Sequence, residues 1–464
     1  MSGPTYECSG ADARGRSKTP PPREKWSRLR RYWVVFRAYR AIVLLERAAA
    51  TRDLVPRILF ATTFFAYFSI GGYIDGHGVF KENNHFFNGD SERAIHDLLP
   101  TIRMPSQVIS LGHPLLAILV DPFVQAFALV LRGSGNLPVL LACHVAGALA
   151  AVLAYLVFRR LDAPRALAAG AAVIYGFSCS ELVFGSIAET FAFVALALTA
   201  SVLVAVRTTN PLANVLVQVT AFGTNAALAP HSLLCAPVLW FPRLRFGRWL
   251  RTTLIFVVLL AVTILVLARL QELFYPGTGY FFQRNGAEAY SRWASLPKTK
   301  EQILHRGAEL ASHFFAFCVV APRPLLTEPP DSITTFMWEQ KRLIAHYDVL
   351  GAIVASAWCL LLLAATAANV RAFFLGDATT RARILFFAGW LFGTFGLFAY
   401  FGDDLLLYST LWTFHLVAWV VLGLTALGPP LERRAGWFKI AAFSFVALLV
   451  LNNGVFVHRM ISQH

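Results

Sequence analysis

The sequence predicts an all-α, polytopic membrane protein. The chain is 57% hydrophobic and only 14% charged, whereas about a quarter of the residues in an average soluble domain are charged. Its mean hydropathy is +0.57, and it contains several apolar runs of the length that membrane-spanning helices need, about 18 residues or more. These observations exclude an ordinary soluble domain.

The formal net charge of +15 is unevenly distributed along the chain. Residues 1–57 contain 13 Lys and Arg residues against five Asp and Glu residues. A basic segment directly before a first span is typical of a cytoplasmic flank attracted to anionic lipid, and we favour this interpretation over nucleic-acid binding. Residues 23–50 are apolar on one side but interrupted by Arg37 and Arg40, which predicts an interfacial helix. We therefore predict that residues 1–54 form a cytoplasmic basic tail.

The six cysteines are scattered and form no C-x-x-C pair, so the sequence predicts neither a disulfide framework nor a metal site. Nucleotide-binding and zinc-protease motifs such as G-x-x-x-x-G-K-[ST], G-x-G-x-x-G and H-E-x-x-H do not occur in the sequence. No cofactor is therefore expected. The first 20 residues are polar, and no secretory signal is expected.

The first span is predicted at about 56–74, and the topology beyond it depends on residues 113–132, "HPLLAILVDPFVQAFALVLR". If that segment crossed the membrane, the basic loops 159–165 and 242–251 would lie outside, against the positive-inside rule. Asp121-Pro122 in its middle also disfavours a regular span. We therefore predict a juxtamembrane or re-entrant helix, which leaves every basic loop on the cytoplasmic side.

This choice predicts about eleven membrane-spanning helices in a transmembrane domain at residues 55–464. The N-terminus is expected in the cytoplasm and the C-terminus outside. A first external loop at about 75–137 contains the juxtamembrane helices, and a large external loop covers about 271–347. The spans are expected at about 56–74, 138–158, 164–179, 187–206, 211–229, 232–242, 250–270, 348–370, 383–400, 406–427 and 437–457.

The first external loop contains an unusually polar stretch, "NNHFFNGDSERAIHDLL" (residues 83–99). Asp90 and Glu92 lie in a turn before a helix-like run. One interpretation is that Asp90 or Ser91 caps this helix by accepting backbone N–H bonds. The other is that a carboxylate at the membrane face takes the proton of an acceptor hydroxyl or holds a cation. The two roles are compatible, and Asp90 and Glu92 are the candidate catalytic residues.

Four further polar residues are expected at the outer ends of helices. His113-Pro114 marks a helix start, where the histidine either makes an interfacial hydrogen bond or contacts a phosphate. Glu189 is the single acid of a long apolar run, and is either functional or a carboxylate that reaches water. Glu181 lies in a short external loop. His231 either contributes to a site or satisfies backbone opened by the preceding proline.

Arg284 and Arg292 lie in the large external loop. Arginines hold phosphate or diphosphate groups by charge-assisted hydrogen bonds, although many loop arginines only face solvent or lipid headgroups. We treat both, with the four residues above, as candidate donor- or acceptor-binding residues.

Three short motifs resemble those of the GT-C superfamily of integral-membrane glycosyltransferases, especially its protein O-mannosyltransferase and aminoarabinose-transferase branch. Asp90-Ser91-Glu92 is similar to an Asp-Ser-Gly-Glu-like element of that family, and His113-Pro114-Leu115 to a His-Pro-Pro-like element. Ala188-Glu189-Thr190-Phe191 is similar to Ala-Glu-Val-Tyr. The likeness covers about residues 55–245. This chain departs from the pattern in lacking a glycine before Glu92 and in having Leu115 at the second proline.

The resemblance implies a GT-C-like helix arrangement and an inverting transferase at the outer membrane face. The donor would be a polyprenyl-phosphate-linked sugar, and the acceptor a hydroxyl of a lipid, glycan or protein. Asp90 would be the general base, and His113 and Glu189 would shape the donor site. The Ala- and Arg-rich composition suggests a bacterial inner membrane, with membrane lipids as further partners.

Two other classes of function fit some of the same residues. One is a secondary transporter with Asp90, Glu189 and His231 as coupling groups, although transporters usually show internal repeats and a binding site at the midplane. The other is a non-catalytic membrane scaffold that binds lipid or a partner.

Overall fold

The computed structural model describes the chain in eight stretches, residues 53–76, 91–98, 112–131, 136–275, 299–323, 347–400, 405–428 and 435–462. All regular elements in these stretches are helices, as predicted. The described residues all belong to one compact unit, Ala50–His464. Asp90, Arg284 and Arg292 lie outside the described residues, as does the side chain of Glu92.

Each of the predicted spans contains a helix. In the described part of the chain, seven helices are long and apolar enough to cross a membrane, consistent with an integral membrane protein. These seven are α3 (Val55–Gly76), α8 (Leu137–Arg160), α14 (Phe246–Phe274), α17 (Val349–Leu375), α18 (Ala378–Tyr400), α19 (Thr410–Leu427) and α21 (Ala435–Ser462). The helices at the other four predicted spans are shorter, namely α9 (Arg165–Gly176), α11 (Phe191–Arg207), α12 (Pro211–Thr224) and α13 (Ala229–Trp240).

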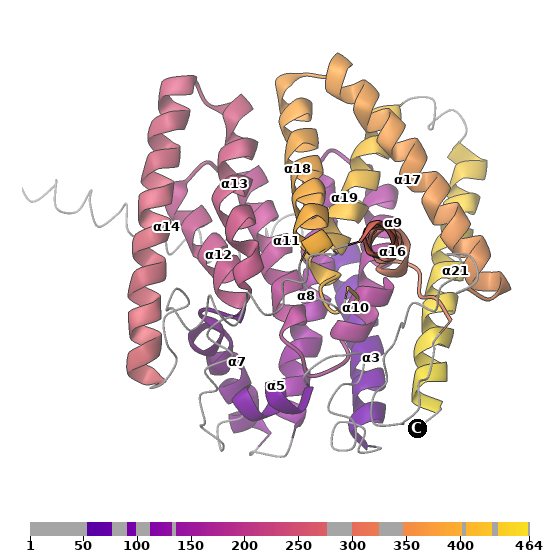
Figure 1. Ribbon diagram of the computed structural model, residues 1–464, viewed down its shortest axis with the longest axis horizontal. Helices are drawn as coiled ribbons and strands as arrows, with labels where there is room; N and C mark the ends of the chain where they lie inside the picture. The colour runs from indigo at the N-terminus through magenta and orange to yellow at the C-terminus, as the bar shows by residue number, and fades with distance from the viewer. Residues whose placement is uncertain are drawn as a thin grey trace, which may run out of the picture. The chain divides into compact units, whose positions relative to one another are not determined.

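Helices α8, α11 and α19 form the centre of the bundle (Figure 1). Helix α8 packs against α3, α9 and α11, and α11 also contacts α12, α13 and α19. Small side chains allow close approach of helices inside a membrane. At the crossing of α19 with α17, a Cβ atom on Gly423 would lie 2.6 Å from the Cα atom of Ala365, so only glycine fits there.

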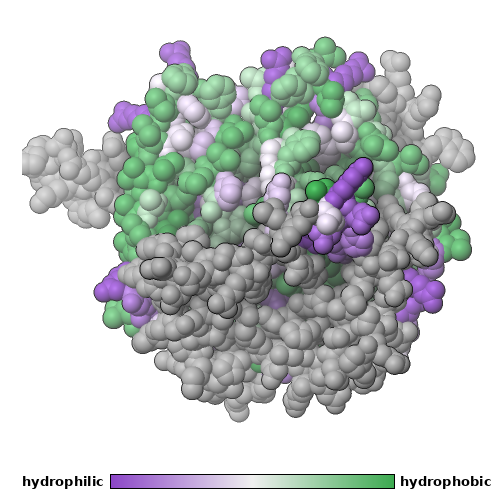
Figure 2. Space-filling model, in the orientation of Figure 1, coloured by the Kyte–Doolittle hydropathy of each residue, from purple (hydrophilic) through white to green (hydrophobic). Residues whose placement is uncertain are grey.

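The outer helices present apolar side chains outward. Only Phe256, Leu260 and Gln271 of α14 are buried, while Leu254 and Val258 are exposed. In Figure 2 the described part of the visible face is mostly hydrophobic, with hydrophilic side chains at its top, at both lower sides and in a patch right of the centre. Since a large exposed apolar surface is unfavourable in water, it indicates burial in lipid.

Helices α3 and α8 run antiparallel. Tyr155 donates a hydrogen bond to Asp53 at one end (2.6 Å), and Asn136 donates to Asp75 at the other (2.9 Å). The chain between Gly76 and Asn136 therefore starts and finishes at the same end of the bundle. Helix α7 (Leu116–Val130), which contains Pro122, belongs to this stretch and is too short to be counted among the candidate spans. This supports the prediction that residues 113–132 do not cross.

The two ends of the bundle differ in charge. We call one the arginine end, because it gathers basic side chains at the ends of several helices (top of Figure 1): Arg159 and Arg160 of α8, Arg207 of α11, Arg243 of η3 (Phe241–Arg243) and Arg383 of α18. We call the other the Glu189 end, because it holds Glu189, Asp75 and Asn136. The positive-inside rule predicts that the arginine end faces the cytoplasm.

Part of the predicted large external loop is packed into the bundle. Helix α16 (Lys300–Ser312) continues into a π-helical turn, η4 (His313–Phe317), and residues 318–321 after it are buried. The Cys179 amide donates to the Val319 carbonyl at 3.1 Å, and Asn453 accepts from the Ala321 amide at 2.8 Å. This segment therefore closes the bundle between α10 (Cys179–Phe184) and α21.

Candidate functional site at the Glu189 end

His113 and Glu189, which the sequence analysis singled out separately, come together through Thr190. His113 Nε2 lies 3.5 Å from Thr190 Oγ1, and Thr190 Oγ1 donates to Glu189 Oε1 at 2.9 Å. Nδ1 of His113 lies 2.5 Å from the Thr224 carbonyl. A carbonyl only accepts, so Nδ1 carries a proton. The hydroxyl proton of Thr190 is used on Glu189, so Nε2 can donate to Thr190 only in the imidazolium form.

Glu189 sits at the N-terminus of α11. Its side chain is nearly buried, with 5% of the residue exposed, and its Oε1 also accepts from the Thr190 amide at 2.7 Å. Its backbone carbonyl accepts from the Cys143 thiol at 3.4 Å. Backbone N–H groups and the helix dipole favour negative charge at a helix N-terminus. The carboxylate is thus held in one orientation, with Thr190 between it and His113.

The turn that carries His113 is fixed to the ends of α12 and α14. The Leu115 amide donates to the Gly223 carbonyl of α12 at 2.9 Å. Gln271 of α14 donates to the Pro114 carbonyl at 2.9 Å and accepts from the Ile118 amide at 3.3 Å. Both ends of the Gln271 amide are therefore used to hold this turn, which positions the histidine ring.

The helix after Asp90 lies against the helix after His113. Helix α5 (Ser91–Leu98) contacts α7, and its buried residues Ala94, Ile95 and Leu98 form its inner face. The segments of all three motifs, α5, the His113 turn and the start of α11, thus belong to one end of the bundle. The side-chain positions of Asp90 and Glu92 lie outside the described residues.

Glu181 lies in the interior rather than beside His113. It is 1% exposed in the short helix α10, between α9 and α11 and outside the seven candidate spans. Burial raises the pKa of its carboxyl to about 8, although a contact with Tyr175 opposes the rise. Its Oε1 makes no hydrogen bond among the described residues, so a neutral carboxylic acid fits this position better than a carboxylate.

His231 also lies inside the bundle, where α13, α18 and α19 meet. Its ring centroid is 5.2 Å from that of His415 and 4.9 Å from that of Trp390. Neither ring nitrogen of His231 or of His415 has a hydrogen-bond partner in the described part of the chain. The structure therefore places His231 in an aromatic cluster, apart from the His113–Glu189 pair.

The sequence analysis did not assign Thr190 and Gln271 to the site. Gln271 had a usable signal, because it is an amide near the end of a long apolar helix, where a buried polar group needs a partner. For Thr190 the sequence offers no signal of a role in the site other than its position directly after Glu189. Within the described ranges, no group of three or more metal-ligating side chains occurs.

Comparison with protein-family models, with curated proteins and with solved structures finds no match to this chain. At one end of the apolar bundle, a histidine and a carboxylate from distant parts of the sequence, His113 and Glu189, meet through Thr190.

Proposed function

We propose that the protein is an integral-membrane glycosyltransferase that moves a sugar from a polyprenyl-phosphate donor to an acceptor hydroxyl at the Glu189 end. The observation that carries this proposal is the link His113–Thr190–Glu189. Helix α5, which begins directly after Asp90, contacts α7, the helix that follows His113. The expected orientation, with the arginine end in the cytoplasm, puts the reaction on the outer face of a bacterial inner membrane.

Asp90 is the proposed general base. The acceptor oxygen attacks the anomeric carbon while Asp90 takes the hydroxyl proton, and the bond from that carbon to the phosphate oxygen breaks. The polyprenyl phosphate leaves with the electron pair, and the configuration inverts. General-base catalysis contributes about 10²–10⁴-fold to such reactions. Glu92, two residues further on, is the second candidate carboxylate of this step.

The His113–Thr190–Glu189 group is the proposed donor-orienting element. In its imidazolium form, His113 is a cation at the level where a lipid phosphate would lie. Glu189 balances that charge through Thr190 and holds the ring in place. Fixed donors aimed at developing negative charge stabilise a leaving phosphate. Arg284 and Arg292 are proposed as additional phosphate ligands, and the apolar exterior of α14 is suited to the lipid chain.

The proposal is tested with purified protein and a panel of polyprenyl-phosphate sugars, by measuring release of polyprenyl phosphate and transfer of the sugar. The native protein should consume at least one donor, and Asp90→Asn should lower the rate about 100-fold or more. Asp121→Asn is the matched control. Asp121 is a carboxylate on α7 that is engaged by Gln125 at 3.0 Å and Tyr275 at 2.5 Å, so its loss should leave donor turnover within a few-fold of native.

Two results would contradict the proposal in different ways. If the native protein turns over no donor of the panel, the assigned reaction is wrong. If Asp90→Asn and Asp121→Asn lose activity equally, the reaction stands but Asp90 is not its base.

A further inference from the structure

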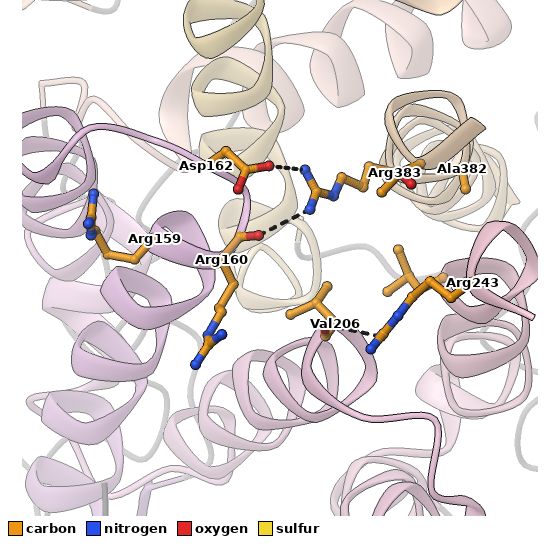
Figure 3. Close-up of a pocket in the computed structure, with 9 residues that line it drawn as sticks. Arg159, Arg160, Asp162, Val206, Arg243, Ala382 and Arg383 are labelled. Atoms are coloured by element: carbon orange, nitrogen blue, oxygen red, sulfur yellow. Dashed lines mark hydrogen bonds and ion pairs between the residues drawn. The ribbon is translucent and has the colours of Figure 1, made fainter. Parts of the chain in front are cut away.

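A second polar site lies at the opposite end of the bundle from Glu189. A cavity of about 360 Å³ opens among the ends of α8, α11 and α18 and the turn η3. Four arginines and one aspartate are among its lining residues. In Figure 3, Arg160, Arg243 and Arg383 stand around the opening, whereas Arg159 turns away from it.

Helix capping explains why these arginines are here. Arg243 donates to the carbonyls of Ala205 (3.2 Å) and Val206 (3.1 Å) at the end of α11. Arg383 donates to the Arg160 carbonyl at the end of α8 (3.2 Å). Cations near the last carbonyls of a helix are favourable. Capping alone would account for the arginines if nothing else distinguished them.

The described lining residues of this cavity carry more positive than negative charge. Arg383 pairs with Asp162 at 2.7 Å, but the Asp162 side chain is 74% exposed, against 20% for Arg383, so water screens the pair. Burial lowers the pKa of Arg243, and the positive charge of Arg383 lowers it further. Two like charges thus repel each other across the cavity, and Asp162 is the one carboxylate among its lining residues.

The guanidinium groups also keep hydrogen-bonding capacity. Each carries about five N–H donors, and the bonds of Arg243 and Arg383 to carbonyls and to Asp162 use only part of that number. A liquid water molecule takes up about 30 Å³, so a cavity of about 360 Å³ accommodates a group of several non-hydrogen atoms.

We propose that this cavity is a phosphate-binding site, in which Arg243 and Arg383 hold one phosphate group between them. Planar guanidinium groups bind phosphate oxygens in pairs. The phosphate would belong either to the headgroup of an anionic phospholipid or to a soluble phosphate. Val206 and Leu239 on the cavity wall are suited to the apolar part of a lipid. The site is separate from the proposed transferase site and does not depend on it.

The test measures thermal unfolding of the full, delipidated protein in detergent at matched ionic strength. The additions are inorganic phosphate, phosphatidylglycerol, or phosphatidylcholine as the zwitterionic comparison. Binding to the folded state should raise the Tm by roughly 2–5 °C. A rise with both anions indicates recognition of the phosphate group, a rise with phosphatidylglycerol alone indicates a lipid headgroup, and a rise with phosphate alone indicates a soluble ligand. No anion-dependent rise would overturn the proposal.

Arg243→Gln should abolish the rise, while Arg251→Gln should keep it. Arg251 is an exposed arginine of α14 and does not line the cavity, so it controls for the loss of one charge. An equal response of both variants would overturn the proposal.

Arg243→Gln also removes a cap from α11, so a second pair of variants tests the cavity with that cap intact. Thr379 lines the cavity in the first turn of α18, so Thr379→Glu places a carboxylate where the phosphate would lie. This variant should raise the Tm without ligand and should no longer respond to anions. Ala378→Glu also adds an acid to the first turn of α18, where the helix dipole favours negative charge. Residue 378 does not line the cavity, so the Tm of this variant should still rise when anions are added. If Thr379→Glu still responds like the native protein, the site is wrong.

Discussion

His113 and Thr190 are far apart in the sequence, but His113 Nε2 lies 3.5 Å from Thr190 Oγ1 at the Glu189 end. The same hydroxyl donates a hydrogen bond to Glu189 Oε1 at 2.9 Å. The threonine is therefore the connection between the two ionisable residues of the proposed donor site. If the Thr190 hydroxyl were removed, the Glu189 carboxylate would still accept a hydrogen bond from the Thr190 amide at 2.7 Å. The hydroxyl therefore connects His113 with Glu189, and the start of α11 keeps its amide bond to Glu189 without it.

Removing that hydroxyl should impair donor use without unfolding the protein. Hydrogen bonds to charged groups are worth about 1.5–3 kcal/mol, so Thr190→Val should lower kcat/KM for the donor about 10- to 100-fold. Thr190→Ser keeps the hydroxyl and should restore most of the activity. The measurement is donor turnover together with the Tm of each variant. Equal activity of the Val and Ser variants would show that the link has no role in catalysis.

The buried carboxyl of Glu181 should make stability depend on pH. Its pKa is about 8 in the folded protein against an ordinary value of 4.5, because burial disfavours the charged form. The unfolded chain ionises near the ordinary value. The stabilisation is therefore complete below pH 4.5 and is lost as the pH rises towards about 8.

This dependence is measured as the Tm in detergent between about pH 5 and pH 9. The Tm of the native protein should fall over this range, and Glu181→Gln should remove that part of the fall. Glu301→Gln, at an exposed position of α16, is the control and should behave like the native protein. A Glu181→Gln variant with the native pH slope would show that the group does not titrate in this range.

The buried histidine pair should be a source of instability. Neither His231 nor His415 has a hydrogen-bond partner for its ring nitrogens among the described residues, and each buried unsatisfied group costs about 1–3 kcal/mol. Replacing both by leucine removes polar atoms from an apolar cluster, so the double variant should have a higher Tm than the native protein. A clear fall in the Tm would contradict this prediction.

The topology predicts which loops a membrane-impermeant thiol reagent reaches. Because Asp75 and Asn136 are joined by a hydrogen bond, single cysteines at Gly76 and Asn136 should react from the same side in intact cells. A cysteine at Asp162, which has an exposed side chain at the arginine end, should react only after permeabilisation. A cysteine-free parent protein is needed, and making it breaks no disulfide among the described residues, because Cys143, Cys179, Cys235, Cys318 and Cys359 are free thiols. Labelling of Gly76 and Asn136 from opposite sides would contradict the fold.

Much of the architecture follows from local signals in the sequence. Apolar runs predict the helices, because a helix that crosses the bilayer needs an apolar stretch of matching length. Basic clusters such as Arg159-Arg160 predict which helix ends lie together, because basic loops collect on one side of the membrane. Asp121-Pro122 predicts that residues 113–132 do not form a regular span, and α7, which contains Pro122, is too short to count among the candidate spans.

The arrangement within the site depends on packing, which periodicity does not encode. Glu181 and Glu189 are close in the sequence, Glu181 in a short predicted external loop and Glu189 at the start of the next apolar run. They differ because Glu189 meets the Thr190 amide and hydroxyl, whereas the Oε1 of Glu181 points into the core without a hydrogen-bond partner in the described residues. The two histidines also differ in their neighbours. The ring of His113 meets polar groups of Thr190 and Thr224, whereas the ring of His231 meets aromatic rings of α18 and α19.

The most direct test of the proposed donor site is a double-mutant cycle between His113 and Glu189. Donor turnover is measured for the native protein, His113→Gln, Glu189→Gln and the double variant, with folding checked by Tm. If the two side chains act as one unit through Thr190, the double variant should lose little more activity than either single variant, because residues that act together are not additive. If the losses in the single variants multiply in the double variant, the two residues act independently and the account is contradicted.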